Sequence, residues 1–291
     1  MKDFVNDLSI FDFIKSDENC ELKEFVTIPF FQNGKEIKDE KAPKCYLTLK
    51  AASSMRFRLN EKNLNRENFF SNVVGEKQVV PLELIHSQVV YAVKKNSLEE
   101  LEVIQSIGIH PDAVVLKKAD GLISVEENIV PVVTVADCVP IFLFDPVTKC
   151  KGILHSGWKG TGIVVNAIKL ASMCYGAKAE NFSVVIGPHI HECCYTIDEE
   201  RALYFDKLIG KGCATSQNQK GVYNLSLARA NIHLLKQIGV LEKNIIHCSD
   251  CTVCTQPPIF GSFRRETSFL PKEMSLNEKI KKFTAMAAFV M

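Results

Sequence analysis

The sequence lacks the features that would mark a membrane or secreted protein. It has no uninterrupted apolar run of the roughly 18 residues that a membrane-spanning helix needs. Its first residues alternate acidic and apolar side chains, whereas a signal peptide needs a basic start and then a continuous apolar stretch. Low-complexity linkers and internal repeats are missing as well. We therefore expect a cytoplasmic protein with no membrane partner.

Net charge is also nearly absent, because 35 Lys and Arg residues stand against 34 Asp and Glu residues, a formal net charge of +1. We expect no nucleic-acid partner, and any anion must be bound by a local cluster of charges. The 291 residues suit one large domain or two moderate ones, and they are enough to bury a substantial core. A monomer or a small homo-oligomer is compatible with this composition.

The eleven cysteines do not have the pattern of a disulfide framework, since their number is odd and several are adjacent or stand in apolar runs. Cys248, Cys251 and Cys254 are spaced as Cys-x-x-Cys-x-x-Cys. This spacing suits a metal ion or an iron–sulfur cluster, and equally three reduced structural thiols. The adjacent pair Cys193 and Cys194 supplies a fourth ligand only if folding brings it near. We expect reduced thiols.

Strand and helix patterns alternate irregularly along the chain. Asn33-Gly34 predicts a turn. Strands are predicted on both sides of a bend within 79–93, and at 113–116, 130–135, 141–144, 152–154, 184–186, 245–247 and 283–290. Helices are predicted at 98–107, 161–175, 198–209 and 225–238. Because no regular βαβ period and no composition break appear, the sequence predicts a single-domain α+β fold.

Three short stretches place reactive side chains at predicted strand ends beside turn residues. They are Ile85-His86-Ser87-Gln88, the segment 134–140 around Cys138, and the segment 154–160 around His155. Two imidazoles and one thiolate suit Zn²⁺, and three protein ligands leave a fourth position for water or substrate, as in catalytic zinc sites. Each residue taken alone also suits an ordinary core position. Together, they predict a metal site that only the fold can assemble.

The segment after His155 is rich in glycine and precedes a predicted helix. Glycines around Trp158 and Lys159 let the backbone approach a ligand, the helix start offers free N–H groups, and Lys159 adds positive charge. This pattern suits a phosphate-binding turn, and equally a turn that simply enters a helix. Trp158 suits stacking on a planar base as well as packing.

Arg264 and Arg265 offer guanidinium groups, which grip phosphate or carboxylate well. Adjacent side chains on a strand point to opposite faces, so we expect one of the two to enter a site. A surface ion pair with Glu266 is the alternative.

These stretches together resemble the family once described as multicopper polyphenol oxidases or laccase-domain proteins, now regarded as zinc-dependent purine nucleoside phosphorylases with adenosine deaminase activity. The resemblance runs from near residue 79 to the end of the chain. Besides the three stretches, it rests on 119–124, Ile186-Gly187-Pro188, Cys193-Cys194-Tyr195, Asn224-Leu225, Asn231, Cys251-Thr252 and Phe263-Arg264-Arg265. It implies a sandwich of two sheets flanked by helices, with the metal on His86, Cys138 and His155.

The resemblance also implies the chemistry. It implies phosphorolysis of adenosine, inosine or methylthioadenosine to free base and ribose 1-phosphate, with deamination of adenosine as a side activity. Zn²⁺ is the implied cofactor, and purine nucleoside and phosphate are the implied substrates. We consider Asp137 or Asp120 for proton transfer, and Lys159 with Arg264 or Arg265 for phosphate.

The sequence departs from the family in two places. The family has a Thr-Arg-x-Gly-Gly-type segment near its N-terminus where this chain has 49–54. Either Lys50 or Arg56 replaces the arginine, or the pocket differs. The segment 266–281 also differs. We therefore divide the chain into a divergent N-terminal segment, 1–45, packed on a phosphorylase-type domain, 46–291.

Three other functions remain open. Cys138 and His155 also suit the nucleophile and base of a cysteine hydrolase that acts on an amide or a peptidoglycan fragment. A copper-dependent phenol oxidase is disfavoured because it calls for more histidines than the seven present, so Cu²⁺ ranks below Zn²⁺ as cofactor. A non-catalytic protein would use Cys-x-x-Cys-x-x-Cys to hold a structural metal.

Overall fold

The computed structural model describes residues 6–58, 61–108, 118–210, 212–217 and 219–291. Its largest element is a mixed sheet of eight strands in the order β1-β17-β13-β11-β12-β9-β7-β8. In chain order these strands are β1 (Asp7–Leu8), β7 (Val90–Lys95), β8 (Leu101–Ile107), β9 (Gly121–Ser124), β11 (Val139–Phe144), β12 (Lys151–Ser156), β13 (Ser183–Ile186) and β17 (Ile245–Cys248).

A second sheet of five strands, in the order β2-β5-β18-β10-β6, packs on one face of the first. Its strands are β2 (Phe25–Ile28), β5 (Cys45–Thr48), β6 (Gln78–Pro81), β10 (Ile129–Val135) and β18 (Met286–Val290). Smaller pieces are the hairpin of β3 (Phe31–Gln32) with β4 (Lys35–Glu36) and the sheet of β14 (Thr196–Asp198), β16 (Val222–Leu225) and β15 (Ala214–Ser216).

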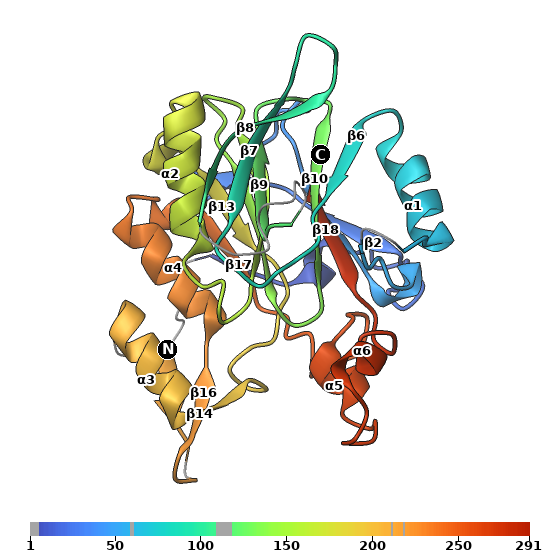
Figure 1. Ribbon diagram of the computed structural model, residues 1–291, viewed down its shortest axis with the longest axis vertical. Helices are drawn as coiled ribbons and strands as arrows, with labels where there is room; N and C mark the ends of the chain where they lie inside the picture. The colour runs from blue at the N-terminus through green and yellow to red at the C-terminus, as the bar shows by residue number, and fades with distance from the viewer. Residues whose placement is uncertain (1–5, 59–60, 109–117, 211, 218) are drawn as a thin grey trace.

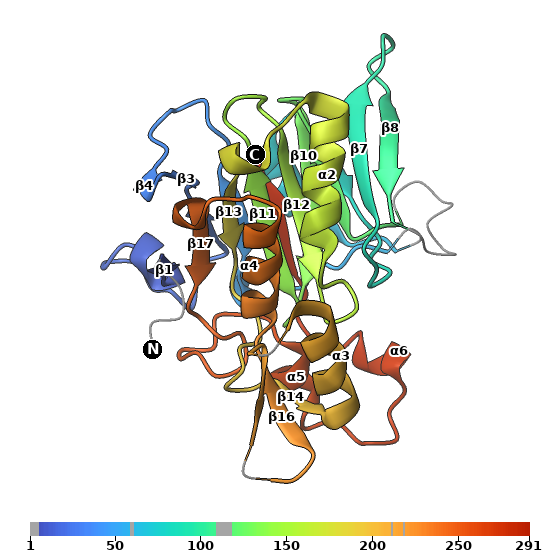
Figure 2. The same ribbon diagram turned by 90° about the vertical axis from the view of Figure 1, so that its left-hand side faces the viewer.

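Helices cover the outer faces of both sheets (Figures 1 and 2). The helices are α1 (Leu64–Val74), α2 (Ile163–Tyr175), α3 (Glu199–Ile209), α4 (Leu227–Gln237), α5 (Phe263–Thr267) and α6 (Leu276–Lys279), with 3₁₀ turns at η1 (Ile10–Phe13), η2 (Lys50–Ala52), η4 (Ala179–Asn181) and η5 (Glu242–Asn244). α2 and α4 lie on the eight-stranded sheet, and α1 lies on the five-stranded sheet. Within the described ranges, no helix is long and apolar enough to cross a membrane.

Alternating side chains build the layered core. In β11, Ile141 and Leu143 pack against α2 and α4, whereas Phe142 and Phe144 pack between the two sheets. Successive strand residues point to opposite faces, so a strand that is buried on both faces is apolar throughout. The fold is therefore the predicted α+β sandwich of two sheets flanked by helices. It brings the start of β11 and the end of β12 to one edge of the sandwich.

Most predicted elements are confirmed, including the strands around the 79–93 bend, the turn at Asn33-Gly34 and the helices that became α2, α3 and α4. The helix predicted at 98–107 is wrong, because β8 occupies 101–107 and pairs antiparallel with β7. Leu101 and Val103 are half-buried while Glu102 is exposed, an alternation that favours a strand once β7 is available as partner. The strand predicted at 113–116 lies outside the described residues.

Candidate active site

His86, Cys138 and His155 meet at the edge of the sandwich, with their ligand atoms within 4.8 Å of one another. Cys138 comes directly before β11, and His155 lies near the end of β12. These strands pair antiparallel, with Pro140 opposite His155, so that the start of one strand lies beside the end of the other. His86 lies in the loop between β6 and β7. The fold thus joins the three residues despite their long separations in sequence.

The backbone around this cluster is unusual. His86 and Asp137 have positive φ angles of 55° and 85°, which side-chain-bearing residues rarely adopt and which are concentrated at functional sites. A Cβ on Gly157 would lie 3.1 Å from the Cys138 sulfur, so glycine keeps the space beside the thiol clear. The local backbone conformation therefore holds the side chains of the cluster in place.

Asp120 lies fully buried behind the cluster and fixes two of its members. Its carboxylate accepts hydrogen bonds from His155 Nδ1 at 2.9 Å, from the His86 N–H at 3.1 Å, and from Ser87 through N–H at 2.6 Å and Oγ at 2.7 Å. Burial opposes its charge, but the bonds from His155 and Ser87 outweigh burial and hold the pKa of Asp120 below its ordinary value. A carboxylate on one imidazole nitrogen orients the ring and frees the other nitrogen for a metal.

Cys138 and His155 form a charged pair. Burial opposes ionisation of the thiol, yet His155 and His86 lower the pKa of Cys138 to about 6. Burial likewise opposes protonation of His155, but the Cys138 thiolate and Asp120 raise its pKa to about 10. At neutral pH the cluster without a metal is thus a thiolate beside an imidazolium. The thiolate is the form of cysteine that binds metals and acts as a nucleophile.

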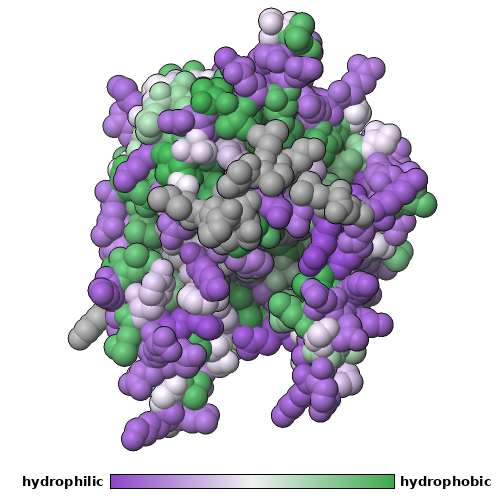
Figure 3. Space-filling view, viewed as in Figure 1, coloured by the Kyte–Doolittle hydropathy of each residue, from purple (hydrophilic) through white to green (hydrophobic). Residues whose placement is uncertain are grey.

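The cluster lines a cavity of about 580 Å³, a size typical of small-molecule sites. Helices α5 and α6 supply one wall, and α4 and the loop before β14 contribute to the opposite side. Figure 1 shows α3 with β14 and β16 projecting on one side and α5 with α6 on the other, and the space-filling view shows a notch between these projections (Figure 3). The aromatic residues that line the cavity are Phe57, Trp158, Tyr195, Phe263 and Phe283.

Only some of the residues predicted to bind substrate line the cavity. Trp158 and Arg264 line the cavity, whereas Lys159 is exposed, lies outside the lining and holds its ammonium 5.4 Å from the centre of the Trp158 ring. Of the glycine-rich turn, Gly157 lines the cavity, but Gly162 packs against the Gln88 side chain at the start of α2. The N-terminus of α2 therefore lies against the Gln88 side chain.

Arg264 and Arg265 lie on the short helix α5, so the assumption of a strand was wrong, although only one of them faces the cavity. The Arg264 guanidinium lies 5.8 Å from the centre of the Tyr195 ring. Arg265 turns away and donates to the carbonyls of Thr252, at 2.7 Å, and of Phe260. Helical geometry also sends adjacent side chains in different directions.

The two predicted carboxylates differ in access. Asp137 lines the cavity and accepts hydrogen bonds from Thr252 Oγ1 at 2.7 Å and from the Arg264 N–H at 2.6 Å. Asp120 is not among the lining residues, and its oxygens serve His155 and the 86–87 backbone. Asp120 is therefore placed to orient the His155 imidazole.

Sequence reasoning missed part of the cavity wall. Arg58 and Glu83 line it, and no local pattern distinguishes them from surface residues. Tyr195 lines it as well; it belongs to a motif of the family resemblance, but no role was predicted for it from the sequence. Of the two replacements considered for the family arginine, Arg56 lines the cavity and donates to the Ile280 carbonyl at 2.9 Å. Lys50 instead pairs with Glu266 at 3.6 Å and lies outside the lining.

A family model described as "Multi-copper polyphenol oxidoreductase laccase" matches residues 46–271. The chain is 34% identical over 167 residues to "Purine nucleoside phosphorylase YlmD" of Bacillus subtilis (strain 168), covering 55% of this chain and 58% of that protein. It is 31% identical over 156 residues to "Purine nucleoside phosphorylase LACC1" of Mus musculus, covering 52% and 36%. It is 28% identical over 172 residues to "Adenosine deaminase RL5" from an unknown prokaryotic organism, covering 56% and 63%.

The matched part thus spans less than two thirds of the length of each of these three relatives. Among solved structures, the hypothetical protein YfiH of Bacillus licheniformis superposes with a TM-score of 0.69 at 23% identity, covering 87% of this chain and 94% of that one. This likeness establishes a shared fold.

Proposed function

Because the chain belongs to the multi-copper polyphenol oxidoreductase laccase family, we propose that it is a zinc-dependent purine nucleoside phosphorylase with adenosine deaminase side activity. The observation that carries the proposal is the His86, Cys138 and His155 cluster at the wall of an aromatic cavity. The relatives' names supply the purine nucleoside.

The donor set fits a zinc ion. Two imidazoles and a thiolate are borderline-soft ligands, and Asp120 behind His155 supplies the carboxylate support common to zinc histidines. Copper fits less well, because a blue-copper site adds a weak axial ligand, typically a Met, to the same trio. Among the described residues that line the cavity there is no Met and no Gln.

A zinc ion held by these residues would supply Lewis acidity, which polarises a substrate oxygen and activates water near neutral pH. The chain itself holds the substrate. Trp158 and Tyr195 offer aromatic surfaces to the planar purine, and aromatic rings favour stacked or edge contacts with such groups. Arg201, on α3, sits 4.4 Å from the centre of the Trp158 ring and holds that ring in place.

The guanidinium groups that line the cavity bind the phosphate in this proposal. Arg264 lines the cavity next to the cluster, and Arg56 and Arg58 line it as well. Guanidinium groups make paired hydrogen bonds to phosphate oxygens and stay charged at any working pH. We assign the first phosphate contact to Arg264, because Arg56 is already bonded to the Ile280 carbonyl and to Glu61.

Asp137 is the carboxylate we assign to proton transfer, because it lines the cavity and Asp120 does not. In phosphorolysis the departing purine takes up a proton as its bond to the sugar breaks, and in deamination the leaving amine does so. Asp120 is then a positioning residue that keeps the His155 ring oriented.

The test is a product assay. Purified protein is incubated with inosine and with adenosine, with and without phosphate, and with and without a zinc chelator. We expect free base and ribose 1-phosphate only when phosphate is present, and their loss on chelation. Failure of zinc-containing protein to convert either nucleoside would refute the proposal.

One observation favours a cysteine hydrolase as a second candidate. Without metal, Cys138 is a thiolate beside the His155 imidazolium, and Asp120 holds the other ring nitrogen, as in a nucleophile–base–carboxylate triad. A thiolate that binds zinc is not free to attack a substrate. Amide hydrolysis by chelated protein, lost after alkylation of Cys138, would favour this candidate over the phosphorylase.

A further inference from the structure

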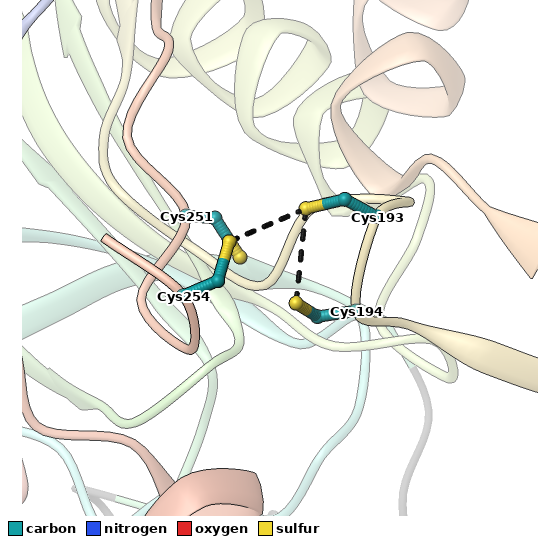
Figure 4. A group of neighbouring side chains, drawn as sticks. All are labelled: Cys193, Cys194, Cys251 and Cys254. Atoms are coloured by element: carbon teal, nitrogen blue, oxygen red, sulfur yellow. Dashed lines mark hydrogen bonds between the residues drawn. The ribbon is translucent and has the colours of Figure 1, made fainter. Parts of the chain in front are cut away.

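A second cluster of four thiols lies outside the cavity lining. Cys193, Cys194, Cys251 and Cys254 bring their sulfur atoms within 4.8 Å of one another. Figure 4 shows the four side chains converging from two loops, one between β13 and β14 and the other after β17. Cys248, which the sequence pattern had grouped with Cys251 and Cys254, is buried in β17 within the core between the sheets.

The sulfur separations match a tetrahedral metal site. Cys193 Sγ lies 3.8 Å from Cys194 Sγ and 3.6 Å from Cys254 Sγ. Zn–S bonds of about 2.3 Å in a tetrahedron set sulfur–sulfur separations of roughly 3.8 Å. A disulfide requires about 2.05 Å, and all four cysteines are free. These two separations, and the 4.8 Å limit on the others, therefore fit four ligands around one ion.

The backbone supports the same arrangement. The His191 N–H donates to Cys251 Sγ at 3.4 Å, a bond that stabilises a thiolate, and such outer contacts orient metal ligands. Cys251 and Cys254 have the Cys-x-x-Cys spacing with which a single tight turn presents two thiolates to one metal ion. Cys251 is buried, whereas Cys193 and Cys254 are exposed, so an ion can enter from solvent.

We propose that Cys193, Cys194, Cys251 and Cys254 bind one Zn²⁺ ion as a closed, structural site. Binding releases the protons of the four thiols and forms four Zn–S bonds, with no change of oxidation state. The ion joins the loop that carries Tyr195 to the segment that leads to α5 and Arg264. It thereby fixes two walls of the cavity from outside.

The experiment counts metal in the full chain. The variant Cys193→Ser/Cys254→Ser removes the two exposed ligands, and Cys174→Ser, at a partly buried cysteine outside every cluster, is the control. After loading with Zn²⁺ and desalting, we expect the double variant to hold one equivalent less than the wild type and the control to hold the same. After loading with Co²⁺, the thiolate-to-metal charge-transfer absorption falls in the double variant only.

Unchanged zinc content in the double variant overturns the proposal. So does a Cys193–Cys254 disulfide found by mass spectrometry in zinc-loaded wild-type protein. If the double variant does not fold, the single change Cys254→Ser is used, with a lowered affinity for the same equivalent as the expected result and unchanged affinity as the contrary one.

A separate observation concerns His189, His191 and His247, whose ligand nitrogens also lie within 4.8 Å of one another. Each of the three rings has a hydrogen-bond partner outside the cluster. His189 Nδ1 faces the Gly187 carbonyl at 2.9 Å, His247 Nδ1 faces an Asp7 oxygen at 3.1 Å, and the His191 ring bonds to the backbone of Cys248. His191 Nε2 is buried with no hydrogen-bond partner.

A carbonyl or carboxylate on one ring nitrogen, which leaves the second nitrogen for an ion, is the arrangement of histidines that bind metals. A buried acceptor without a partner is costly, and a cation at the centre removes that cost. The geometry points to a further divalent transition-metal ion bound by these three imidazoles.

Ni²⁺ and Zn²⁺ are the probes for this site. We expect His191→Gln to hold one equivalent less of either ion after desalting, with the thiolate-to-cobalt absorption unchanged. His233→Gln, at an exposed histidine on α4, is the control and is expected to match the wild type. Wild-type metal content in folded His191→Gln overturns the inference. If that variant does not fold, Asp7→Asn is expected to weaken binding by about 10-fold or more, and unchanged affinity is the contrary result.

Discussion

Two clusters in this molecule each bring three ligand atoms within 4.8 Å, yet their surroundings differ. The cluster of His86, Cys138 and His155 lines a cavity, and His86 is exposed. The cluster of His189, His191 and His247 lies outside that lining, and His189 is buried with 1% of its surface exposed. An open position suits catalysis, whereas a closed shell suits structure.

The charges differ as well. In the open cluster, the Cys138 thiolate and Asp120 raise the pKa of His155 to about 10 despite its burial. In the closed cluster, burial and the neighbouring His247 lower the pKa of His191 to about 4. A thiolate and a carboxylate beside the ring thus reverse the direction in which the pKa of a buried imidazole shifts. The comparison indicates that the anionic ligand and the access route, and not the number of histidines, distinguish the proposed catalytic centre.

The largest expected effect is that of Cys138→Ala. This variant removes the anionic ligand of the open cluster, so it should lose one zinc equivalent and at least ~10³-fold in phosphorolysis, since a bound metal supplies several kcal/mol of transition-state stabilisation. Metal analysis and product chromatography measure the two losses, and circular dichroism checks the fold. Cys174→Ser is the control. Full zinc content in Cys138→Ala would remove Cys138 from the metal site.

The next effect is a pH dependence of thiol alkylation in chelated protein. The pKa of Cys138 is lowered from 9.0 to about 6, so the thiolate persists down to that pH and is lost as the pH falls through it. Iodoacetamide should modify Cys138 with a rate midpoint near pH 6. Burial raises the pKa of Cys174, so its midpoint should lie above the ordinary value. Peptide mass spectrometry resolves the two sites, and a Cys138 midpoint near 9 would contradict the charged pair.

Asp120→Asn should have an intermediate effect. The amide keeps the shape of the carboxylate but loses the charge behind His155, so metal affinity and activity should fall about 10–100-fold. Competition with a chromophoric chelator gives the affinity. Ser87→Ala is the comparison, because it removes one neutral hydrogen bond to Asp120 and leaves the charge in place. Equal affinities for Asp120→Asn and the wild type would show that the carboxylate does not support the metal.

An effect of similar size, measured in KM, separates the two neighbouring arginines. Arg264→Gln should raise the KM for phosphate about 10–100-fold with little change in Tm, because a charge-assisted hydrogen bond contributes about 1.5–3 kcal/mol. Arg265→Gln should lower Tm instead, because its guanidinium holds the carbonyls of Thr252 and Phe260. Steady-state kinetics at varied phosphate and thermal melts distinguish them. A raised KM in Arg265→Gln alone would reverse the assignment.

The sequence predicted the fold class and the three residues of the open cluster, because apolar strands ending in reactive side chains and turn residues form a local pattern. It did not predict β8, since the spacing of Leu101 and Ile104 fits a helix as well as a strand and only β7 decides between them. Nor did it show that Asp120 stands behind His155 or that Arg58 reaches the cavity. Those contacts join residues that no short-range pattern connects.

The central claim, that His86, Cys138 and His155 hold the metal of an active enzyme, is tested most directly by anomalous X-ray diffraction at the zinc absorption edge. The crystals should come from protein shown to release free base from inosine. The account predicts an anomalous peak within about 2.0–2.3 Å of the two imidazole nitrogens and the Cys138 sulfur. A crystal of active protein with no peak there, whatever its content at the other two clusters, would contradict the account.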